Sequence, residues 1–306
     1  MQTFADLVLE WLVKYKKNSV KASTYDRLET SFSQFVKYDI SKMRVEDLTP
    51  DDLQKYLNQL VLDGYALTTI KKQYHLLTGF IEYANLNGLI LRPIHKGVRL
   101  PAESAVKKHR KNVMAYTHEE QERLIDILEQ GDSDAYYAIM LMMETGMRAG
   151  EVLALTWSDI DWRRKSIRIS KTMIRLGNGK RNYIQQEAKS FSSNRTIPMS
   201  TRAYELLQRH KLRITHDREA VFQTVKGEYL TYEALRWWTK KACDEADVPY
   251  YGQHVFRHTF ATNCYERGCD VKLLSKYLGH ADVTITYNVY IHLFGDALEQ
   301  LRTIVG

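Results

Sequence analysis

The chain has 306 residues, 44% of them hydrophobic and 26% charged, which is ordinary for a soluble globular protein and excludes a disordered chain. It opens without a basic segment followed by an apolar run, and no stretch of about eighteen apolar residues occurs, so we expect neither a signal peptide nor a membrane span. The three cysteines lack the paired spacing of a zinc site or a disulfide framework, which favours a reducing cytoplasm. This length suits two domains.

The net charge of +7 is concentrated in one short segment. Residues 98–112 hold five lysines and arginines against one glutamate, which is more than half of the excess. Such a run can be a solvated linker, or it can lie along a phosphate backbone and release counterions on binding. In the second case four side chains would make the contact: Lys107, Lys108, Arg110 and Lys111.

Residues 1–97 are predicted to form a bundle of four helices. Apolar residues spaced three and four apart indicate a first helix over residues 4–15, and a second should begin near Ser23. Thr49 followed by Pro50 is a typical helix start, because threonine caps the free N–H groups and proline suits the first helical position. A fourth helix should run from about residue 66 to an Asn-Gly pair that ends at residue 88.

The second domain is predicted over residues 113–306, after a basic linker at 98–112, because Pro93 and Pro101 bracket a stretch of weak periodicity that marks the boundary. It should be mainly helical with one small antiparallel sheet. A capping box at Thr117 and Glu120 indicates its first helix, and the next should cover about 136–144. Alternating and extended segments predict strands at 166–169, 171–186 and 195–199, and further helices should begin near Thr201, Thr231, Gly252, Asp270 and Asp282.

Two arginines stand in motifs that suit phosphodiester chemistry. A phosphodiester under attack gains negative charge on its non-bridging oxygens, and arginine meets that charge with a planar fork that stays protonated. Arg148 lies in the run TGMRAGE at residues 145–151, where Glu151 follows it by three residues and could hold its guanidinium. Arg257 lies on the helix predicted after Gly252. Without clustered acidic metal ligands, the set favours an enzyme that uses its own hydroxyl nucleophile.

Histidines accompany these arginines. His254 precedes Arg257 by three residues on one helix face, and an imidazole can exchange protons near neutral pH. His254 and His258 also have zinc-ligand spacing, but neither a His-Glu-x-x-His motif nor a convincing third ligand accompanies them. His280 should project from a helix end capped by Gly279, although an exposed turn histidine is the plain alternative.

Ten residues after His280 comes Tyr290, the candidate nucleophile, with Tyr287 as its rival. In order and spacing, TGMRAGE at 145–151, HVFRHTFAT at 254–262, LGH at 278–280 and YIH at 290–292 resemble the tyrosine recombinase (phage integrase) family. The resemblance implies that Arg148 and Arg257 clamp the scissile phosphate while His254 and His280 assist by hydrogen bonding and proton transfer. It also implies that Tyr290, and not Tyr287, forms a 3′-phosphotyrosine.

The same resemblance points to a catalytic lysine. Members of the family have a lysine near the active site before a Thr-Ile-Pro strand, and the run AKSFSSNRTIP at 188–198 is similar to that motif. Lys189 would then protonate the 5′-hydroxyl leaving group, with Lys171, Lys180 and Arg181 as nearby alternatives. The long extension at 171–186 resembles integrases of phages and conjugative elements more than chromosome-dimer resolvases.

The resemblance further implies a fold, a substrate and partners. Residues 1–97 resemble the family's helical core-binding domain, and Thr69, Lys71 and Lys72 on its fourth helix are candidate DNA-facing residues. We expect a cytoplasmic site-specific recombinase that acts on double-stranded DNA through a Holliday junction, as a homo-tetramer on two sites, in integration or excision of mobile DNA. An apolar stripe within residues 293–306 would dock on a neighbouring protomer or on its own domain.

Phosphotyrosine conserves the energy of the broken bond, so no cofactor is expected, while DNA-bending or directionality factors could act as accessories. Three alternatives stay open. The chain could be a chromosome-dimer-resolution recombinase, a nicking and rejoining enzyme similar to type IB topoisomerases, or a catalytically silent DNA-binding regulator.

Overall fold

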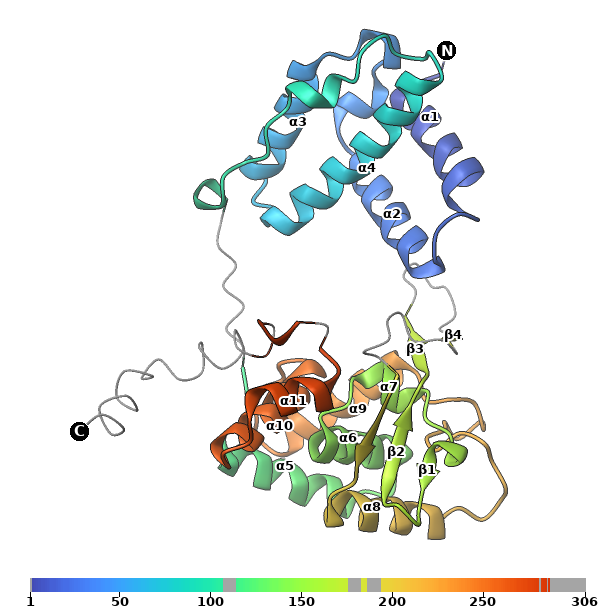
Figure 1. The fold of residues 1–306 in the computed structure, drawn as a ribbon, viewed down its shortest axis with the longest axis vertical. Coiled ribbons are helices and arrows are strands. Elements are labelled where there is room, and N and C mark those ends of the chain that lie inside the picture. The colour runs from blue at the N-terminus through green and yellow to red at the C-terminus, as the bar shows by residue number, and fades with distance from the viewer. Residues whose placement is uncertain are drawn as a thin grey trace, which may run out of the picture. The chain divides into compact units, whose positions relative to one another are not determined.

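The computed structural model describes residues 2–106, 114–175, 183–185, 194–280, 282–284 and 286. These residues form two compact units, the first ending at residue 106 and the second starting at residue 114 (Figure 1). Each unit has its own hydrophobic core. Most of the described residues are helical, as the sequence predicts.

The described part of the first unit contains four α-helices. Thr3 and Thr49 begin two of them, and each accepts a hydrogen bond from the backbone of an aspartate three residues later whose carboxylate bonds back. The helices are α1 Phe4–Trp11, α2 Ala22–Phe35, α3 Pro50–Leu62 and α4 Leu67–Leu86. A π-helical turn, Leu12–Lys16, extends α1, and short 3-10 turns cover Asp39–Lys42, Val45–Asp47, Ile94–Gly97 and Glu103–Ala105.

Aromatic side chains hold this bundle together. Phe4 lies 5.0 Å from Phe35 and 5.6 Å from Phe80 between ring centroids, and all three are fully buried. The one amide in this core, Gln73, donates to Ser31 O and Gln34 Oε1, so its burial costs little. The four predicted helices are therefore confirmed.

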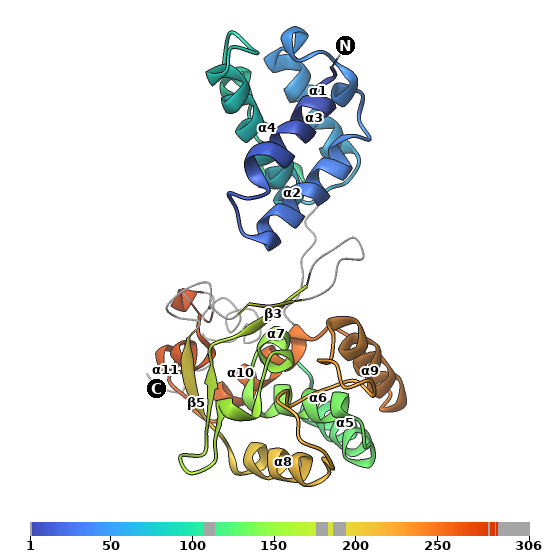
Figure 2. The same cartoon turned by 90° about the vertical axis from the view of Figure 1, so that its right-hand side faces the viewer.

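In the second unit seven α-helices pack with two small antiparallel sheets among the residues described (Figure 2). The helices are α5 His118–Gln130, α6 Asp134–Thr145, α7 Ala149–Leu153, α8 Thr201–Leu212, α9 Tyr232–Glu245, α10 His254–Glu266 and α11 Val271–Leu278. The strands are β1 Ile160–Asp161, β2 Ser166–Ile169, β3 Thr172–Ile174, β4 Tyr183–Gln185 and β5 Arg195–Pro198. A 3-10 turn, Trp157–Asp159, precedes β1.

The predicted small antiparallel sheet is present as β1, β2 and β5, and β3 and β4 form a second, two-stranded sheet apart from it. β2 lies between β1 and β5, with Ile167 opposite Ile197, whereas β3 pairs with β4 in a separate hairpin. The hairpin separates because β3 packs on α7 instead of continuing the first sheet. A Cβ on Gly150 of α7 would lie 2.7 Å from Met173 O, so only glycine allows this approach. The helix expected near Asp282 lies mostly outside the described residues.

Helix α6 runs through the middle of the second unit and packs against α5, α8, α9 and α10 (Figure 2). Most of its residues, including the run 138–142, are buried. A helix that is apolar nearly all round belongs in the interior, as α6 does. Its two ends therefore mark two distant places in the unit, about 18 Å apart for a helix of this length.

Candidate active site

The TGMRAGE run is a tight connection between two helices. α6 ends at Thr145, and Gly146 follows in the left-handed conformation with φ 61°. A Cβ on Gly146 would lie 2.5 Å from the ring of Phe260, so both the backbone angle and the packing require glycine. Arg148 is the N-cap residue of α7, which places its side chain at the junction of α6 and α7.

Glu151 connects two arginines. Its Oε1 accepts from Arg148 Nη1 at 2.9 Å, which is the pairing that the three-residue spacing suggests. Arg195 of β5 donates Nη1 and Nη2 to the two oxygens of the same carboxylate, each at 3.0 Å. Burial alone would raise the pKa of Glu151, but the hydrogen bonds and charges of Arg195 and Arg148 hold it below its usual value. Glu151 is therefore a buried anion that both arginines share.

Arg257 lies deep in the same region, on α10. Its side chain is buried, and it donates to Gly146 O at 3.0 Å and Leu278 O at 2.7 Å. Burial and the nearby Arg148 lower the pKa of Arg257 to about 9, which leaves it protonated at neutral pH. These bonds join the end of α6 to the end of α11.

His280 follows the C-terminal cap of α11 and faces these arginines. Gly279 has φ 70° and ends the helix, as the sequence predicts. Burial, then the charges of Arg257, Arg148 and other neighbours, lowers the pKa of His280 to about 3, so its imidazole is neutral at pH 7. His280 Nδ1 lies 2.7 Å from the hydroxyl of Thr286, a residue that is itself buried.

His254 and His258 lie on successive turns of α10, with ring centroids 6.5 Å apart. His254 is exposed and His258 is half-buried. Burial, followed by the charges of His254 and Arg257, lowers the pKa of His258 to about 4. Within the described ranges no group of three histidines, cysteines or acids could hold a metal ion, so nothing there supports the zinc alternative.

The arrangement carries an excess of positive charge. Among the described residues, Arg148 and Arg195 bind the one carboxylate of Glu151 and Arg257 lies near it, and the charges of all three arginines depress the pKa of His280. Buried charge of one sign is costly unless a counterion arrives. Because the Arg148 side chain is 35% exposed, an anion from solvent can reach it. The arrangement can therefore accept an anion such as a phosphate.

A sequence profile described as the Phage integrase family matches residues 115–296, more than half of the chain. A second profile, the N-terminal SAM-like domain of phage integrases, matches residues 3–61. The chain belongs to the phage integrase family.

Two relatives align with nearly the whole integrase chain. The "Tyrosine recombinase XerC-like" protein of Caldanaerobacter subterraneus subsp. tengcongensis is 28% identical over 95% of this chain and 79% of its own. The integrase of Staphylococcus phage L54a is 25% identical over 95% of this chain and 89% of its own. Among solved structures, the integrase of transposon Tn1549 bound to transposon right-end DNA has a TM-score of 0.78 at 23% identity, with both chains fully covered. This structural similarity supports the fold of the chain.

The structure brings together only part of the predicted catalytic set. Arg148 binds Glu151 and also donates to Gly279 O at 3.2 Å, and Arg257 donates to Leu278 O, so these side chains meet at the turn that carries His280. His254 lies one turn before Arg257 on the same helix. Other predicted residues lie outside the described residues: Lys189, Tyr290, its rival Tyr287, the alternatives Lys180 and Arg181, and the linker residues Lys107, Lys108, Arg110 and Lys111.

Among the alternatives to Lys189, Lys171 is described and has another task. Its Nζ lies 2.8 Å from the buried carboxylate of Asp159 and donates to Thr156 Oγ1 at 2.6 Å. Lys171 therefore stabilises a buried charge. In the first unit, Lys71 and Lys72 on α4 are exposed and Thr69 is half-buried, so the two lysines are accessible to a ligand. No helix within the described ranges is long and apolar enough to cross a membrane.

Sequence reasoning missed two residues of this integrase site, Arg195 and Thr286. A signal for Arg195 was readable, since alternation along β5 places it on the same face as the buried Ile197. An arginine on a core-facing strand position needs a buried partner, and Glu151 supplies it. Thr286 carries no comparable signal, because a threonine six residues after a histidine has no fixed relation to it.

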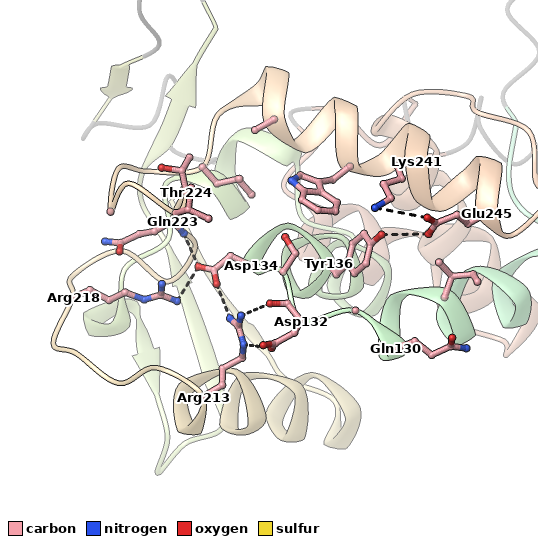
Figure 3. Close-up of a pocket in the computed structure, with 18 of the residues that line it drawn as sticks. Gln130, Asp132, Asp134, Tyr136, Arg213, Arg218, Gln223, Thr224, Lys241 and Glu245 are labelled. Atoms are coloured by element: carbon pink, nitrogen blue, oxygen red, sulfur yellow. Dashed lines mark hydrogen bonds and ion pairs between the residues drawn. The ribbon is translucent and has the colours of Figure 1, made fainter.

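A separate cavity of about 910 Å³ lies at the other end of α6 (Figure 3). Asp134 there pairs with Arg213 at 2.6 Å and Arg218 at 2.9 Å, and Tyr136 donates to Glu245 at 3.5 Å. None of the residues that line this cavity belongs to the arginine site, by which we mean Arg148, Glu151, Arg195, Arg257 and His280. The acids and arginines drawn in Figure 3 already bind one another, which contrasts with the arginine site.

Proposed function

We propose that this chain is a site-specific DNA recombinase that cuts and rejoins strands through a transient 3′-phosphotyrosine at Tyr290, in integration or excision of mobile DNA. The observation that carries the proposal is the buried surplus of arginine around one glutamate, next to a neutral histidine. That surplus fits a phosphodiester, whose charge grows as it reacts.

Strand cleavage is an in-line exchange at phosphorus. Arg148 and Arg257 bind the non-bridging oxygens and stabilise their growing charge. The Tyr290 hydroxyl forms the new P–O bond and gives its proton to a base, for which His254 is the candidate. The bond from phosphorus to the 5′ oxygen breaks, and Lys189 protonates the leaving oxygen. One phosphate ester replaces another, so the step needs no nucleotide or metal.

His280 takes part as a neutral group. We assign the Thr286 hydroxyl as the donor to Nδ1, which places the imidazole proton on Nε2, where the N–H can donate to a phosphate oxygen. A neutral donor suits a place already crowded with arginines, because a second proton there would be repelled. The direction of the His280 pKa shift thus supports a hydrogen-bonding role before the phosphate binds.

Stoichiometry supports a homo-tetramer on two DNA sites. Recombination between two duplexes cuts four strands, and each chain offers one nucleophilic tyrosine. Four chains exchanging strands in pairs pass through a Holliday junction. Residues 293–306 would join neighbouring protomers, and a chain lacking them should cleave single sites but fail to recombine pairs. Full recombination by that truncated chain would rule out the assignment to the tail.

The decisive test is covalent trapping. A duplex is selected from a random-sequence library by its binding to the Tyr290→Phe chain, and a nick beside the cleavage position then lets the cut fragment diffuse away. We expect the wild type to form a 3′ adduct on this selected duplex and Tyr290→Phe to form none. An adduct lost instead in Tyr287→Phe would move the nucleophile, and no adduct with any chain would favour the silent regulator.

The same DNA separates recombination from topoisomerase-like relaxation. A supercoiled plasmid with two selected sites should yield recombinant circles, whereas relaxation without recombinants would indicate a nicking and rejoining enzyme. The sizes of the recombinant products also show whether the DNA between the two sites was deleted, as direct repeats require, or inverted. The site of action that this proposal implies is the bacterial cytoplasm, where DNA-bending or directionality factors could assist.

DNA binding itself is assigned to the basic linker and to α4. Replacing Lys107, Lys108, Arg110 and Lys111 by alanine should flatten the fall of affinity with salt, because each lost phosphate contact reduces the slope by about 0.9. Replacing Thr69, Lys71 and Lys72 should weaken binding to the selected duplex. An unchanged salt slope in the linker variant would show that residues 98–112 only connect the domains.

A further inference from the structure

The C-terminal end of α11 is held by three arginines from three separate segments. Tyr277 O accepts from Arg195 Nε at 2.8 Å, and the next two carbonyls accept from the other arginines of the site. Leu278 O accepts from Arg257 Nη2 at 2.7 Å, and Gly279 O from Arg148 Nη2 at 3.2 Å. Three consecutive carbonyls just before His280 therefore each have a different arginine.

The position of these bonds follows from helix chemistry. The last carbonyls of a helix have no partner within it, and the negative end of the helix dipole attracts cations. In α11 the N–H groups of Gly279 and His280 return to Lys276 O and Ser275 O, so the carbonyls that follow need other donors. The arginines supply them and fix the turn that presents His280.

Arg195 differs from Arg148 in which acceptors its guanidinium nitrogens bind. Both of its Nη atoms bind the Glu151 carboxylate and its Nε binds Tyr277 O, so all three nitrogens bind protein acceptors. Its side chain is 9% exposed, against 35% for Arg148. Arg148 can reach a phosphate, while Arg195 is committed to Glu151 and the end of α11.

We propose that Arg195 is a positioning residue for strand cleavage, which locks Glu151, and through it Arg148, to the turn that presents His280. The proposal rests on the proposed recombinase function. Arg195 makes no contact with DNA in this scheme. It acts through Glu151, which would otherwise have Arg148 as its one remaining arginine partner among the described side chains and would draw that fork away from the phosphate.

The chemistry requires an arginine at this position. A guanidinium offers three nitrogens in one plane, so it can bind both carboxylate oxygens and a carbonyl beyond them at once. A lysine has a single nitrogen and cannot span Glu151 and Tyr277 O together. Arg195→Lys would therefore keep the charge and lose the geometry, which separates positioning from electrostatics.

The test measures cleavage and binding separately on the selected nicked duplex. In Arg195→Lys and Arg195→Gln we expect the single-turnover rate of adduct formation at saturating DNA to fall by about 100-fold, the usual result of small misplacement of a reacting group. The Kd for the duplex should stay nearly unchanged. A wild-type cleavage rate in Arg195→Lys, or a loss of affinity as large as the loss of rate, would overturn the proposal.

Two controls address folding. Arg202→Gln removes an arginine that is 75% exposed and paired with Glu144 at 3.8 Å, and it should leave cleavage unchanged. Ile197→Val creates a small cavity in β5 beside Arg195, so it should lower Tm while preserving the cleavage rate of the folded chain. If Ile197→Val slows cleavage as much as Arg195→Lys does, β5 is needed only for stability and the proposal fails.

A double-mutant cycle tests the route through Glu151. If Arg195 acts by holding that carboxylate, Arg195→Gln should slow cleavage little further in a Glu151→Gln background. If the double variant instead loses the product of the two single-variant rate losses, Arg195 acts independently of Glu151 and the proposal is overturned. The wild type separates the two hypotheses: no wild-type adduct contradicts the recombinase function, whereas a wild-type adduct with unaffected Arg195 variants contradicts the positioning role alone.

Discussion

The two ends of α6 use the same residue types in opposite ways. At the N-terminal end, Asp132 and Asp134 meet Arg213 and Arg218, so acids and arginines balance in number (Figure 3). At the C-terminal end, the described arginines outnumber the acids: Arg148 and Arg195 bind the carboxylate of Glu151, while Arg257 binds backbone carbonyls. Charges that balance within the protein stabilise a fold, and a surplus calls for a ligand.

Helix chemistry alone does not distinguish these ends. Aspartates at the start of α6 and Arg257 bound to Gly146 O at its end both suit the helix dipole. The difference lies in the number of carboxylates available. Arginine-rich clusters should therefore be judged by their surplus over buried acids, which neither burial nor motif content measures.

The largest effect should come from removing the guanidinium of Arg148, one of the arginines in excess over the buried acids. In Arg148→Lys we expect adduct formation to slow by about 100- to 1,000-fold, the usual cost of losing one donor that stabilises the transition state. Because the Arg148 side chain is partly exposed, its replacement should leave the fold intact. Single-turnover trapping on the selected duplex measures the rate, and Arg213→Lys at the other end is the control. Equal losses in both variants would contradict the comparison.

At the balanced end the effect should fall on stability. Arg218→Met removes one partner of a pair in which the side chains are 8% and 11% exposed, leaving Asp134 with Arg213. Because Arg213 still neutralises Asp134, we expect the loss of this one charged hydrogen bond to cost about 2 kcal/mol of unfolding free energy. Urea denaturation measures this loss, and the cleavage rate of the folded variant should match the wild type. Slow cleavage by a folded Arg218→Met chain would give this end a functional role.

Acid should destabilise the same end through His210. This fully buried ring stacks between Tyr137 and Phe222, and burial lowers its pKa to about 4. The unfolded chain binds the proton near pH 6.5, so stability is retained above that pH and declines as pH falls towards 4. At pH 5 the loss should be about 2 kcal/mol.

Urea midpoints at pH 7 and pH 5 measure this loss. His210→Gln should be less stable at pH 7 because the stacked ring is gone, yet its stability should change less between the two pH values. An equal pH dependence in both chains would assign the acid sensitivity to other groups, such as His258 and His280, whose pKa values are also depressed.

Much of the fold could be predicted because its signals are local. The cap at Thr49, the capping box at Thr117 and the stop at Gly279 each depend on residues within one helical turn, and the structure has them where the sequence places them. The small antiparallel sheet was also predicted, but the separation of β3 and β4 from it was not. Whether β3 joins β2 or leaves it depends on packing against Gly150 and Tyr232, which lie far from β3 in sequence.

The candidate site divides in the same way. The Arg148–Glu151 pair follows from local spacing, whereas the bond from Arg195 to Glu151 spans 44 residues and depends on the register between β2 and β5. No periodicity encodes that register across the intervening hairpin. Motifs could therefore identify the residues proposed to bind the phosphate and miss those that hold them in place.

Thr286 gives the smallest and most specific test of the surplus end. Its hydroxyl is the described partner of His280 Nδ1, and the hydrogen bond on one ring nitrogen decides which nitrogen carries the proton. Thr286→Val keeps the shape of the side chain and removes the hydroxyl. Without that hydrogen bond at Nδ1, the imidazole proton of His280 is no longer held on Nε2. Adduct formation should slow by about 10-fold, the lower range for losing a partner that orients a histidine.

Thr286→Ser restores the hydroxyl and should restore most of the rate, while Thr286→Val should bind the selected duplex as the wild type does. If serine is as slow as valine, the methyl group and its packing matter more than the hydrogen bond. His280 would then be oriented by the end of α11 alone, and the arginines that hold that end would be its whole support. The pair of variants thus decides whether the neutral histidine belongs to the charge surplus or only lies beside it.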